Sequence, residues 1–414
     1  MNSFQKNIQF YKFCSYGFLK NLRFFDAFFI LFLMEKGLPY TQIGILYALR
    51  EIVINVFEIP SGIIADTYGR KNALVSSFVI YIFSFYVFYT ATEFWLFTIA
   101  FVLYGIADAF RSGTHQSMIM DYLKLNDWSA HKISYYGHTR SYSQKGSAIS
   151  SLVAGVLIFY SGSYEHIFLY SMVPYALNFM LILSYPAYLN KSEVQKSLKK
   201  KERLKLTLST FFIIIRQKKV LSIINTSAVH SAYLKAIKDY IQPLMVNLAL
   251  ITPFMLEVEI EKKNGIIIGL LYFIIYILSS SASKYSSKLV GSNKHSISKL
   301  TLFLGFAFGL LSGLFFYYDM WIAAFICFVG IYLIENIRKP ILTGFVADHV
   351  PNEIFTSVIS VQAQLKTIFT AILAVGFGIL ADHYGIGLSL LVLSIGLILS
   401  TLFLNVFLVK PKTK

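Results

Sequence analysis

The sequence contains few charged residues. Asp, Glu, Lys and Arg make up 14% of its 414 residues, whereas hydrophobic residues make up 56%. A soluble chain of this length needs a larger charged fraction to cover its surface. The composition therefore excludes an ordinary soluble protein and predicts that lipid solvates part of the molecule.

Cysteines and nucleotide-binding motifs are also scarce. The two cysteines, Cys14 and Cys327, both fall inside apolar runs. Two isolated cysteines exclude a disulfide framework and a thiolate metal cluster. The sequence has no G-x-x-x-x-G-K-[S/T] phosphate loop, which argues against ATP-driven transport by this chain. We therefore expect neither a metal nor a cofactor.

Acidic residues are outnumbered by basic ones, 21 against 37, and the formal net charge is +16. Such an excess can indicate a nucleic-acid-binding protein. Here, however, the basic residues gather in alternate connections between apolar runs, as Arg70 and Lys71 do. That asymmetry is typical of membrane topology. It predicts no nucleic-acid partner and a multi-pass protein of the cell membrane with both termini in the cytoplasm.

Long apolar runs are abundant. About twelve occur, each close to the roughly 20 residues that cross a bilayer as a helix. They lie near residues 13–34, 41–65, 73–92, 94–120, 139–162, 165–189, 219–246, 264–284, 299–318, 320–346, 354–381 and 386–409. The alternating segments of about ten residues that form a membrane β-barrel are absent. The sequence thus predicts an all-α membrane protein with about twelve transmembrane helices.

The longest break between apolar runs divides the chain into two halves. We expect an N-terminal six-helix lobe at 1–189, a basic cytoplasmic linker at 190–218, and a C-terminal six-helix lobe at 219–414. The linker is either a solvated connection or a segment that lies on anionic lipid headgroups, where each basic residue adds on the order of 1 kcal/mol.

A short motif follows the second apolar run. Gly62, Asp66, Gly69, Arg70 and Lys71 match the pattern G-x-x-x-D-x-x-G-R-[K/R] at every fixed position. The two glycines allow a sharp turn and a close approach. The chain therefore resembles the major facilitator superfamily (MFS) of secondary transporters over essentially its whole length.

The resemblance implies a bundle of two lobes that opens alternately to each side of the membrane. It also implies a gating latch formed by the motif together with Asp121, at the cytoplasmic end of the fourth helix. Two signatures of drug–proton antiporters are missing. Phe101 stands where they carry an Arg, and the segment from Gly146 to Gly155 contains no Pro.

A second segment is similar to the motif. Residues 378–385 read G-I-L-A-D-H-Y-G, and residues 62–69 read G-I-I-A-D-T-Y-G. Inverted three-helix repeats would place equivalent elements on opposite faces of the membrane. Coincidence is the alternative explanation.

Ionisable residues inside the apolar runs are the candidates for substrate and proton binding. A charge at a helix centre costs roughly 2.5–3.5 kcal/mol on insertion scales, so such residues face a cavity or a partner. The candidates are Arg23, Asp26, Glu51, Glu58, Asp108, Arg111, His115, Lys235, Lys238, Glu335 and Arg338. Runs three, six, nine and twelve carry no ionisable core residue except Tyr, and in the superfamily these helices face lipid. The alternative role of the candidates is a set of structural ion pairs.

The fourth run carries the most specific pattern. Asp108, Arg111 and His115 are spaced i, i+3 and i+7, which predicts one stripe along a continuous helix. In one interpretation, Arg111 holds an anionic group of the substrate and Asp108 or His115 relays a proton. In the other, Asp108 and Arg111 only neutralise each other.

These observations predict a secondary transporter, and not an enzyme. Its expected cargo is a small polar or anionic organic solute, moved by alternating access with proton coupling. The alternatives are an exporter of amphipathic or cationic drugs, and a membrane receptor or enzyme on a transporter scaffold. The expected partners are a small-molecule substrate, membrane lipid and protons, and the expected oligomeric state is a monomer.

Overall fold

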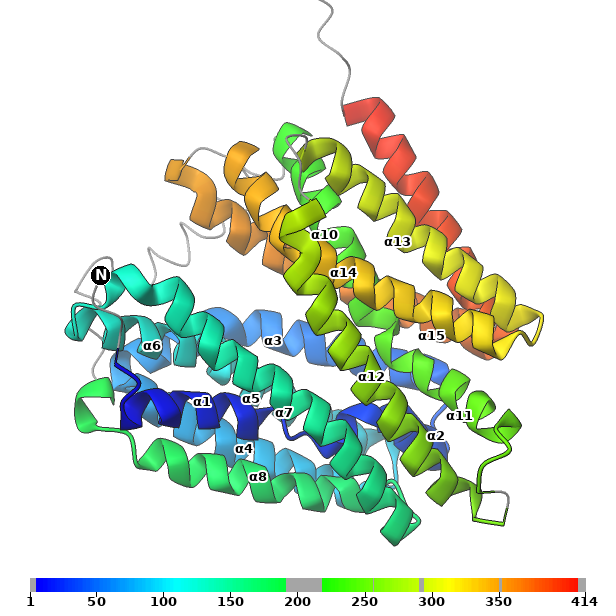
Figure 1. The fold of residues 1–414 in the computed structure, drawn as a ribbon, viewed down its shortest axis with the longest axis horizontal. Coiled ribbons are helices and arrows are strands. Elements are labelled where there is room, and N and C mark those ends of the chain that lie inside the picture. The colour runs from blue at the N-terminus through cyan, green and yellow to red at the C-terminus, as the bar shows by residue number, and fades with distance from the viewer. Residues whose placement is uncertain (1–4, 191–217, 256, 290–293, 350–351, 409–414) are drawn as a thin grey trace, which may run out of the picture. The chain divides into compact units, whose positions relative to one another are not determined.

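The protein is built of helices. The computed structural model describes residues 5–190, 218–255, 257–289, 294–349 and 352–408, and these residues contain no β-strand (Figure 1). Within this part of the chain, seven helical stretches are long and apolar enough to cross a membrane. One of them, Val361–Phe403, has 43 residues. At 1.5 Å per residue that length suffices for two crossings. The prediction of an all-α membrane protein is confirmed.

The other predicted crossings are helical too, but charge or a break interrupts their apolar character. The first run is divided into α1 (Ile8–Lys20), a 3₁₀ turn η1 (Phe24–Ala27) and α2 (Phe29–Glu35). The second run is the single helix α3 (Tyr40–Tyr68). The seventh is divided into α10 (Lys218–Ile237), a 3₁₀ turn and α11 (Ile241–Ile251).

The chain folds as two compact units. Unit 1 contains Met1–Lys36, Leu49–Lys200 and Phe254–Tyr276, and unit 2 contains Gly37–Ala48, Lys201–Pro253 and Ile277–Lys414. Two helices, α3 and α12 (Ile260–Leu289), contribute residues to both units. The predicted lobes 1–189 and 219–414 stay a prediction, and residues 191–217 of the predicted linker lie outside the described residues.

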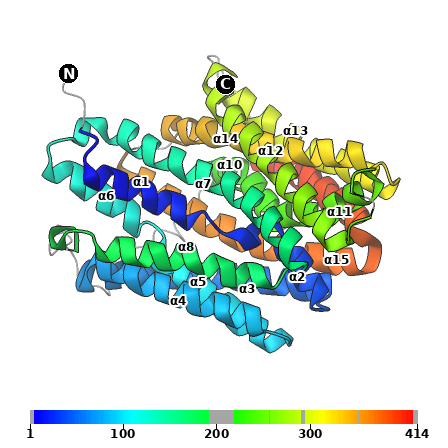
Figure 2. The same ribbon diagram turned by 60° about the horizontal axis from the view of Figure 1, so that its bottom comes forward.

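Unit 1 is a bundle with an aromatic core. Its further helices are α4 (Arg70–Thr90), α5 (Phe94–Arg111), α6 (Thr114–Leu125), α7 (Lys132–Ser161) and α8 (His166–Leu183). α4 packs between α5 and α8, and α1 packs along α7 (Figure 2). Phe25 stacks on Phe168 with ring centroids 5.2 Å apart, and Phe29 stacks on Phe101 at 5.3 Å. The aromatic residues of the first helices therefore serve mainly as packing in unit 1.

The outer faces of α4 and α8 are apolar. Val79, Phe83 and Tyr86 of α4 are all exposed, and so are Val173 and Leu177 of α8. Their spacing of three or four residues places each set along one side of its helix. Such exposed apolar stripes need lipid or another apolar surface to cover them. α4 and α8 correspond to the third and sixth runs, which carry no ionisable core residue except Tyr.

Glycines let α1 and α7 approach closely. A Cβ at Gly17 of α1 would overlap Ser143 of α7, and a Cβ at Gly146 of α7 would overlap the backbone carbonyl of Phe18. Small residues at a helix crossing permit such backbone contact in membrane bundles. The contact fixes the facing sides of α1 and α7, on which several polar residues lie.

The first half of α12 packs on α7 within unit 1. Gly155 of α7 meets Gly265 and Gly269 of α12, and each glycine abuts backbone of the other helix. Beside this crossing, Asn264 donates a hydrogen bond to the Tyr164 hydroxyl at 3.4 Å. Burial raises the pKa of Tyr164 to about 12, so this hydroxyl stays neutral near pH 7.

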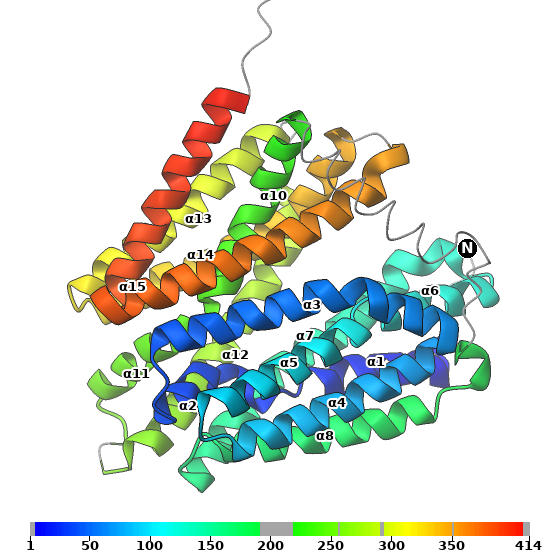
Figure 3. The same cartoon turned by 180° about the vertical axis from the view of Figure 1, so that it is seen from behind.

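Unit 2 packs α13 (Lys294–Tyr317) against α14 (Trp321–His349), and both α10 and α13 against α15 (Asn352–Leu408). The helix α15 reverses direction at Gly385, which has φ 77° and ψ 167° (Figure 3). Gly69, which separates α3 from α4, also has a positive φ of 100°. The two similar segments of the sequence therefore share a backbone feature that favours glycine.

Asp382, in the second of these segments, caps the start of α3. Its two carboxylate oxygens accept hydrogen bonds from the backbone N–H groups of Tyr40 and Thr41, at 2.8 and 2.7 Å. Both residues belong to unit 2, as Asp382 does. The first N–H groups of a helix have no partner inside it, and a carboxylate there also interacts favourably with the helix dipole. Asp382 thus fixes the first turn of α3.

Replacing Asp382 with Ala should lower the free energy of unfolding by about 0.5–2 kcal/mol, because the cap is lost. Asp382→Asn should lose less stability, since the Asn side chain keeps one of the two acceptor oxygens. Thermal unfolding of the purified protein in detergent would measure both changes. His383→Ala, at the adjacent exposed position, is the control and should leave the midpoint unchanged. Equal midpoints for Asp382→Ala and the wild type would refute the capping role.

Candidate functional site

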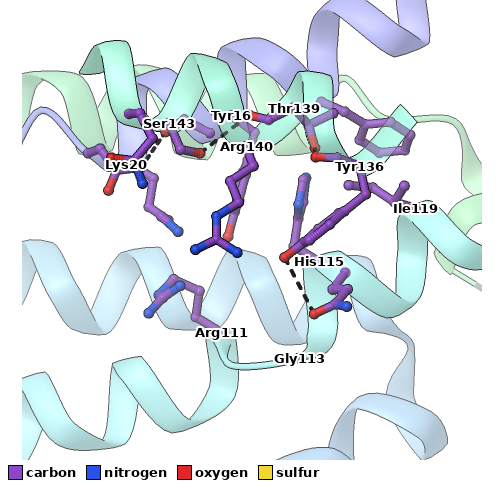
Figure 4. A pocket seen from close by; sticks show the side chains of 15 residues that line it. Tyr16, Lys20, Arg111, Gly113, His115, Ile119, Tyr136, Thr139, Arg140 and Ser143 are labelled. Atoms are coloured by element: carbon purple, nitrogen blue, oxygen red, sulfur yellow. Dashed lines mark hydrogen bonds between the residues drawn. The ribbon is translucent and has the colours of Figure 1, made fainter. Parts of the chain in front are cut away.

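A polar cavity of about 290 Å³ opens in unit 1, lined by residues from α1, α6 and α7 and from the end of α5. Figure 4 shows Lys20, Arg111 and Arg140 with their cationic ends pointing into the same part of this cavity. The lining residues include no Asp or Glu. Three basic side chains therefore meet around a space that can hold a small molecule.

Two of these cations, Lys20 and Arg140, form no ion pair and no side-chain hydrogen bond within the part of the chain that the structure describes. Lys20 is half-buried and Arg140 is exposed at the edge of the cavity. Lys20 also lies close enough to Arg111 for the two charges to repel. An anion between them would relieve that repulsion.

Arg111 is held by Asp108 and Tyr81. Its guanidinium forms an ion pair with Asp108, and its Nε donates to the Tyr81 hydroxyl at 3.0 Å. The Tyr81 hydroxyl in turn donates to Asp108 Oδ1 at 2.5 Å. Asp108 does not line the cavity, whereas Arg111, which it helps to orient, does.

The predicted continuous stripe of Asp108, Arg111 and His115 is wrong, because the helix breaks inside it. α5 ends at Arg111, Ser112 is extended, and Gly113 adopts a left-handed conformation with φ 73°. α6 then starts at Thr114. Glycine favours this turn because it has no Cβ. Arg111 and His115 nevertheless line the same cavity, from the two sides of the break.

The break also exposes a helix start. No side chain caps α6, and Gly113, His115 and Gln116 at its start line the cavity. The free N–H groups of a first helical turn carry partial positive charge. They add to the positive potential that Lys20 and Arg140 create.

Aromatic and neutral polar groups complete the cavity wall. His115 stacks on Tyr16 with ring centroids 3.5 Å apart, and its Nε2 lies 3.3 Å from the Tyr185 hydroxyl. Tyr136 donates to Gln116 at 3.5 Å. Asn21, Thr139 and Gln144 also line the space. These groups can exchange hydrogen bonds with hydroxyl or amide groups of a solute.

The other predicted candidates of unit 1 lie apart from this wall. Arg23 pairs with Asp26 at 2.8 Å and donates to Tyr104 at 2.9 Å, beside a space of about 10 Å³ that is too small for a solute. Glu51 is fully buried and lies 3.3 Å from Arg50, whereas Glu58 is exposed.

In unit 2, the structure brings Glu335 together with a residue outside the predicted set. Glu335 Oε2 lies 2.8 Å from Nδ1 of His230. Arg338 is fully buried. Lys238 pairs with Asp239 at 3.3 Å in the 3₁₀ turn η4 (Lys238–Tyr240). Lys235 is half-buried, one turn before this break in the helix.

The predicted latch residues are placed as follows. Arg70 forms an ion pair with Asp121 of α6, and both residues belong to unit 1. Lys71 donates to the carbonyls of Leu183 and Tyr185, each at 2.7 Å, at the end of α8. Gly62 is exposed on α3. The side chain of Asp66 lies outside the described residues.

The predicted site residues did not include Lys20, Arg140 or His230. Lys20 lies three residues before Arg23, a spacing that marks a second charge in the first run. Arg140 lies at the start of a predicted span, where a basic residue indicates membrane topology. His230 becomes significant only through its contact with Glu335, 105 residues later in the chain.

A bundle of membrane-spanning helices with a charged cavity is typical of multi-pass membrane transporters. The sequence model of the Major Facilitator Superfamily matches residues 13–368. The chain belongs to this superfamily.

Known proteins agree with that assignment. An uncharacterized MFS-type transporter of Bacillus subtilis (strain 168), YxaM, is 23% identical over 412 residues, which cover 97% of this chain and 96% of that protein. The crystal structure of the nucleoside transporter NupG superposes with a TM-score of 0.72 at 13% identity, covering 97% of both chains. A D-xylose–proton symporter gives a TM-score of 0.67 at 13% identity, covering 98% of both. At these identities the structural similarity shows the fold alone.

Exchanging the charges of Asp108 and Arg111 would show whether Arg111 only forms an ion pair with Asp108 or also binds the solute. The double variant Asp108→Arg, Arg111→Asp keeps an ion pair but puts a carboxylate at the cavity wall, so we expect a folded protein that does not transport. Solute transport in proteoliposomes and size-exclusion profiles would measure this. Restored transport in the double variant would show that only pairing matters.

Proposed function

We propose that this MFS transporter carries a small anionic organic solute. The main support for this proposal is the charge imbalance of the cavity. Its lining contains Lys20, Arg111 and Arg140 and no acidic residue. Asp108 compensates Arg111, which leaves two positive charges for the solute to neutralise. Charge-assisted hydrogen bonds to carboxylate or phosphate are about twice as strong as neutral ones.

The cavity also limits the size and polarity of the solute. A volume of about 290 Å³ is at the lower end of small-molecule sites. Its wall mixes cations with amides, hydroxyls and the stacked rings of Tyr16 and His115. A cationic drug would meet like charge here, which counts against the alternative of a cationic-drug exporter.

Proton coupling, orientation and oligomeric state form the rest of the proposal. Ionisable groups inside spans often mark proton pathways, and a structurally similar protein is a D-xylose–proton symporter. The alternation of basic connections supports a cell-membrane protein with both termini in the cytoplasm. We propose that the chain works as a monomer in lipid.

Counterflow in proteoliposomes tests the solute class. The panel contains labelled succinate, glycerol 3-phosphate, lactate, xylose, uridine and alanyl-alanine, with unlabelled solute inside the vesicles. We expect exchange of an anion and none of the neutral sugar or nucleoside. Exchange of only neutral solutes would refute the proposal.

The variant Arg140→Gln should raise the concentration of the exchanged anion that gives half-maximal exchange about tenfold, because one charged hydrogen bond is lost. Lys145→Gln is the matched control. Lys145 lies on the same helix and is exposed, but it does not line the cavity. An equal effect of both variants would show that the cavity does not bind the anion.

A further inference from the structure

A second group of ionisable residues is buried in unit 2. His230 of α10 and Arg338 of α14 are each 0% exposed, and Glu335 of α14 is 3% exposed. Glu335 and Arg338 repeat the acid-x-x-Arg spacing of Asp108 and Arg111. The two groups differ in their surroundings, because Arg111 lines the cavity and Arg338 is enclosed by helices.

Arg338 is held by neutral acceptors. Its guanidinium donates to the carbonyls of Ser298 and Thr226, each at 2.6 Å, and to the Thr301 hydroxyl at 2.8 Å. A buried guanidinium needs a compensating negative charge, and Glu335 lies one helical turn before it. We therefore assign one positive charge to Arg338 and one negative charge to Glu335, which leaves His230 neutral.

Glu335 fixes the tautomer of His230. Its Oε1 accepts from the Ser231 hydroxyl, and its Oε2 lies 2.8 Å from His230 Nδ1. An ionised carboxylate only accepts hydrogen bonds, so Nδ1 carries the ring proton. The lone pair of the neutral imidazole is then at Nε2.

The Nε2 atom of His230 is buried and has no hydrogen-bond partner among the described residues. It lies against Gly305 of α13, where an added Cβ would overlap the ring. Each oxygen of Glu335 already accepts one hydrogen bond, and Arg338 has no free lone pair for a proton. Nε2 is thus the one basic nitrogen of His230, Glu335 and Arg338 whose lone pair is not engaged.

We propose that Nε2 of His230 is a proton-binding site, and that it binds and releases one proton in each transport cycle. This proposal rests on the proton-coupled transport proposed above and names the group that carries the proton. On protonation, the formal charge of His230, Glu335 and Arg338 together rises from 0 to +1.

The packing at Gly305 links this proton to conformation. A protonated Nε2–H has no acceptor in the arrangement observed, so protonation disfavours this packing. It favours a conformation in which α13 moves away and the N–H meets water. Differential proton affinity of two conformations is what couples a proton to transport. Gly305 is a positioning residue, because it lets α13 close over the ring.

Among the described residues, few other charged or titratable groups face His230 and Glu335. On α14, Arg338 and Lys339 act on it electrostatically, and Lys339 is exposed. On α10, the ring of Tyr233 contacts His230, and its hydroxyl is bonded to Ser394 of α15 at 2.7 Å. From α13 the neighbour is the uncharged Phe306.

Proton binding can be tested without a solute. Histidine ¹⁵N NMR of the full chain in lipid nanodiscs would follow each imidazole against pH. We expect one buried imidazole signal to titrate, to disappear in His230→Gln, and to persist in His383→Gln, the exposed control. In Glu335→Gln, the midpoint of the His230 titration should move to lower pH by about one unit or more, because the nearby negative charge is gone. The proposal would be overturned by a His230 signal that does not titrate, or by one whose titration midpoint is the same in Glu335→Gln as in the wild type.

Transport by the same variants separates this proposal from the proposed function. With the panel anion that shows wild-type counterflow, His230→Gln and Glu335→Gln should keep counterflow at equal pH on both sides. Both should lose accumulation driven by an imposed pH gradient, with the concentration ratio falling to about one. Wild-type accumulation in both variants would refute the proton site. Absence of any wild-type counterflow would instead refute the proposed function, and the NMR titration would still decide on His230.

Discussion

The cost of holding charge among membrane-spanning helices governs this structure. Each unpaired charge at a helix centre costs roughly 2.5–3.5 kcal/mol on insertion scales. The chain meets that cost mainly by pairing, as Arg23 with Asp26 and Arg111 with Asp108 show. Lys20 and Arg140 are different, because they face the cavity without a partner among the described residues. The function proposed for unit 1 depends on that difference.

Helix breaks allow these charges to be placed. The first span breaks at η1, which contains Asp26, the fourth breaks directly after Arg111, and the seventh breaks at Lys238. A broken helix frees backbone N–H and C=O groups, which membrane proteins tolerate only where protein or a polar cavity satisfies them. The breaks and the ion pairs therefore act together. They place polar backbone and side-chain groups inside the bundle and leave apolar side chains on its outer face.

The sequence was sufficient to predict the fold class and the superfamily, because span length, the pattern of basic residues and the motif at Gly62–Lys71 are local signals. It also grouped Asp108, Arg111 and His115, of which Arg111 and His115 line the cavity and Asp108 pairs with Arg111. It did not predict the break at Gly113, since the residues around it fit a helical pattern. Nor did it identify the contact between His230 and Glu335, because pairing across 105 residues depends on how α10 and α14 pack.

The most direct measurement is an experimental structure of the chain with its exchanged solute bound. The account predicts that an anionic group of the solute lies within hydrogen-bond distance of Lys20, Arg111 and Arg140, between α1, α6 and α7. It predicts that Asp108 still pairs with Arg111 when the solute is bound. A neutral or cationic group at this position, or a solute bound away from these three residues, would contradict it.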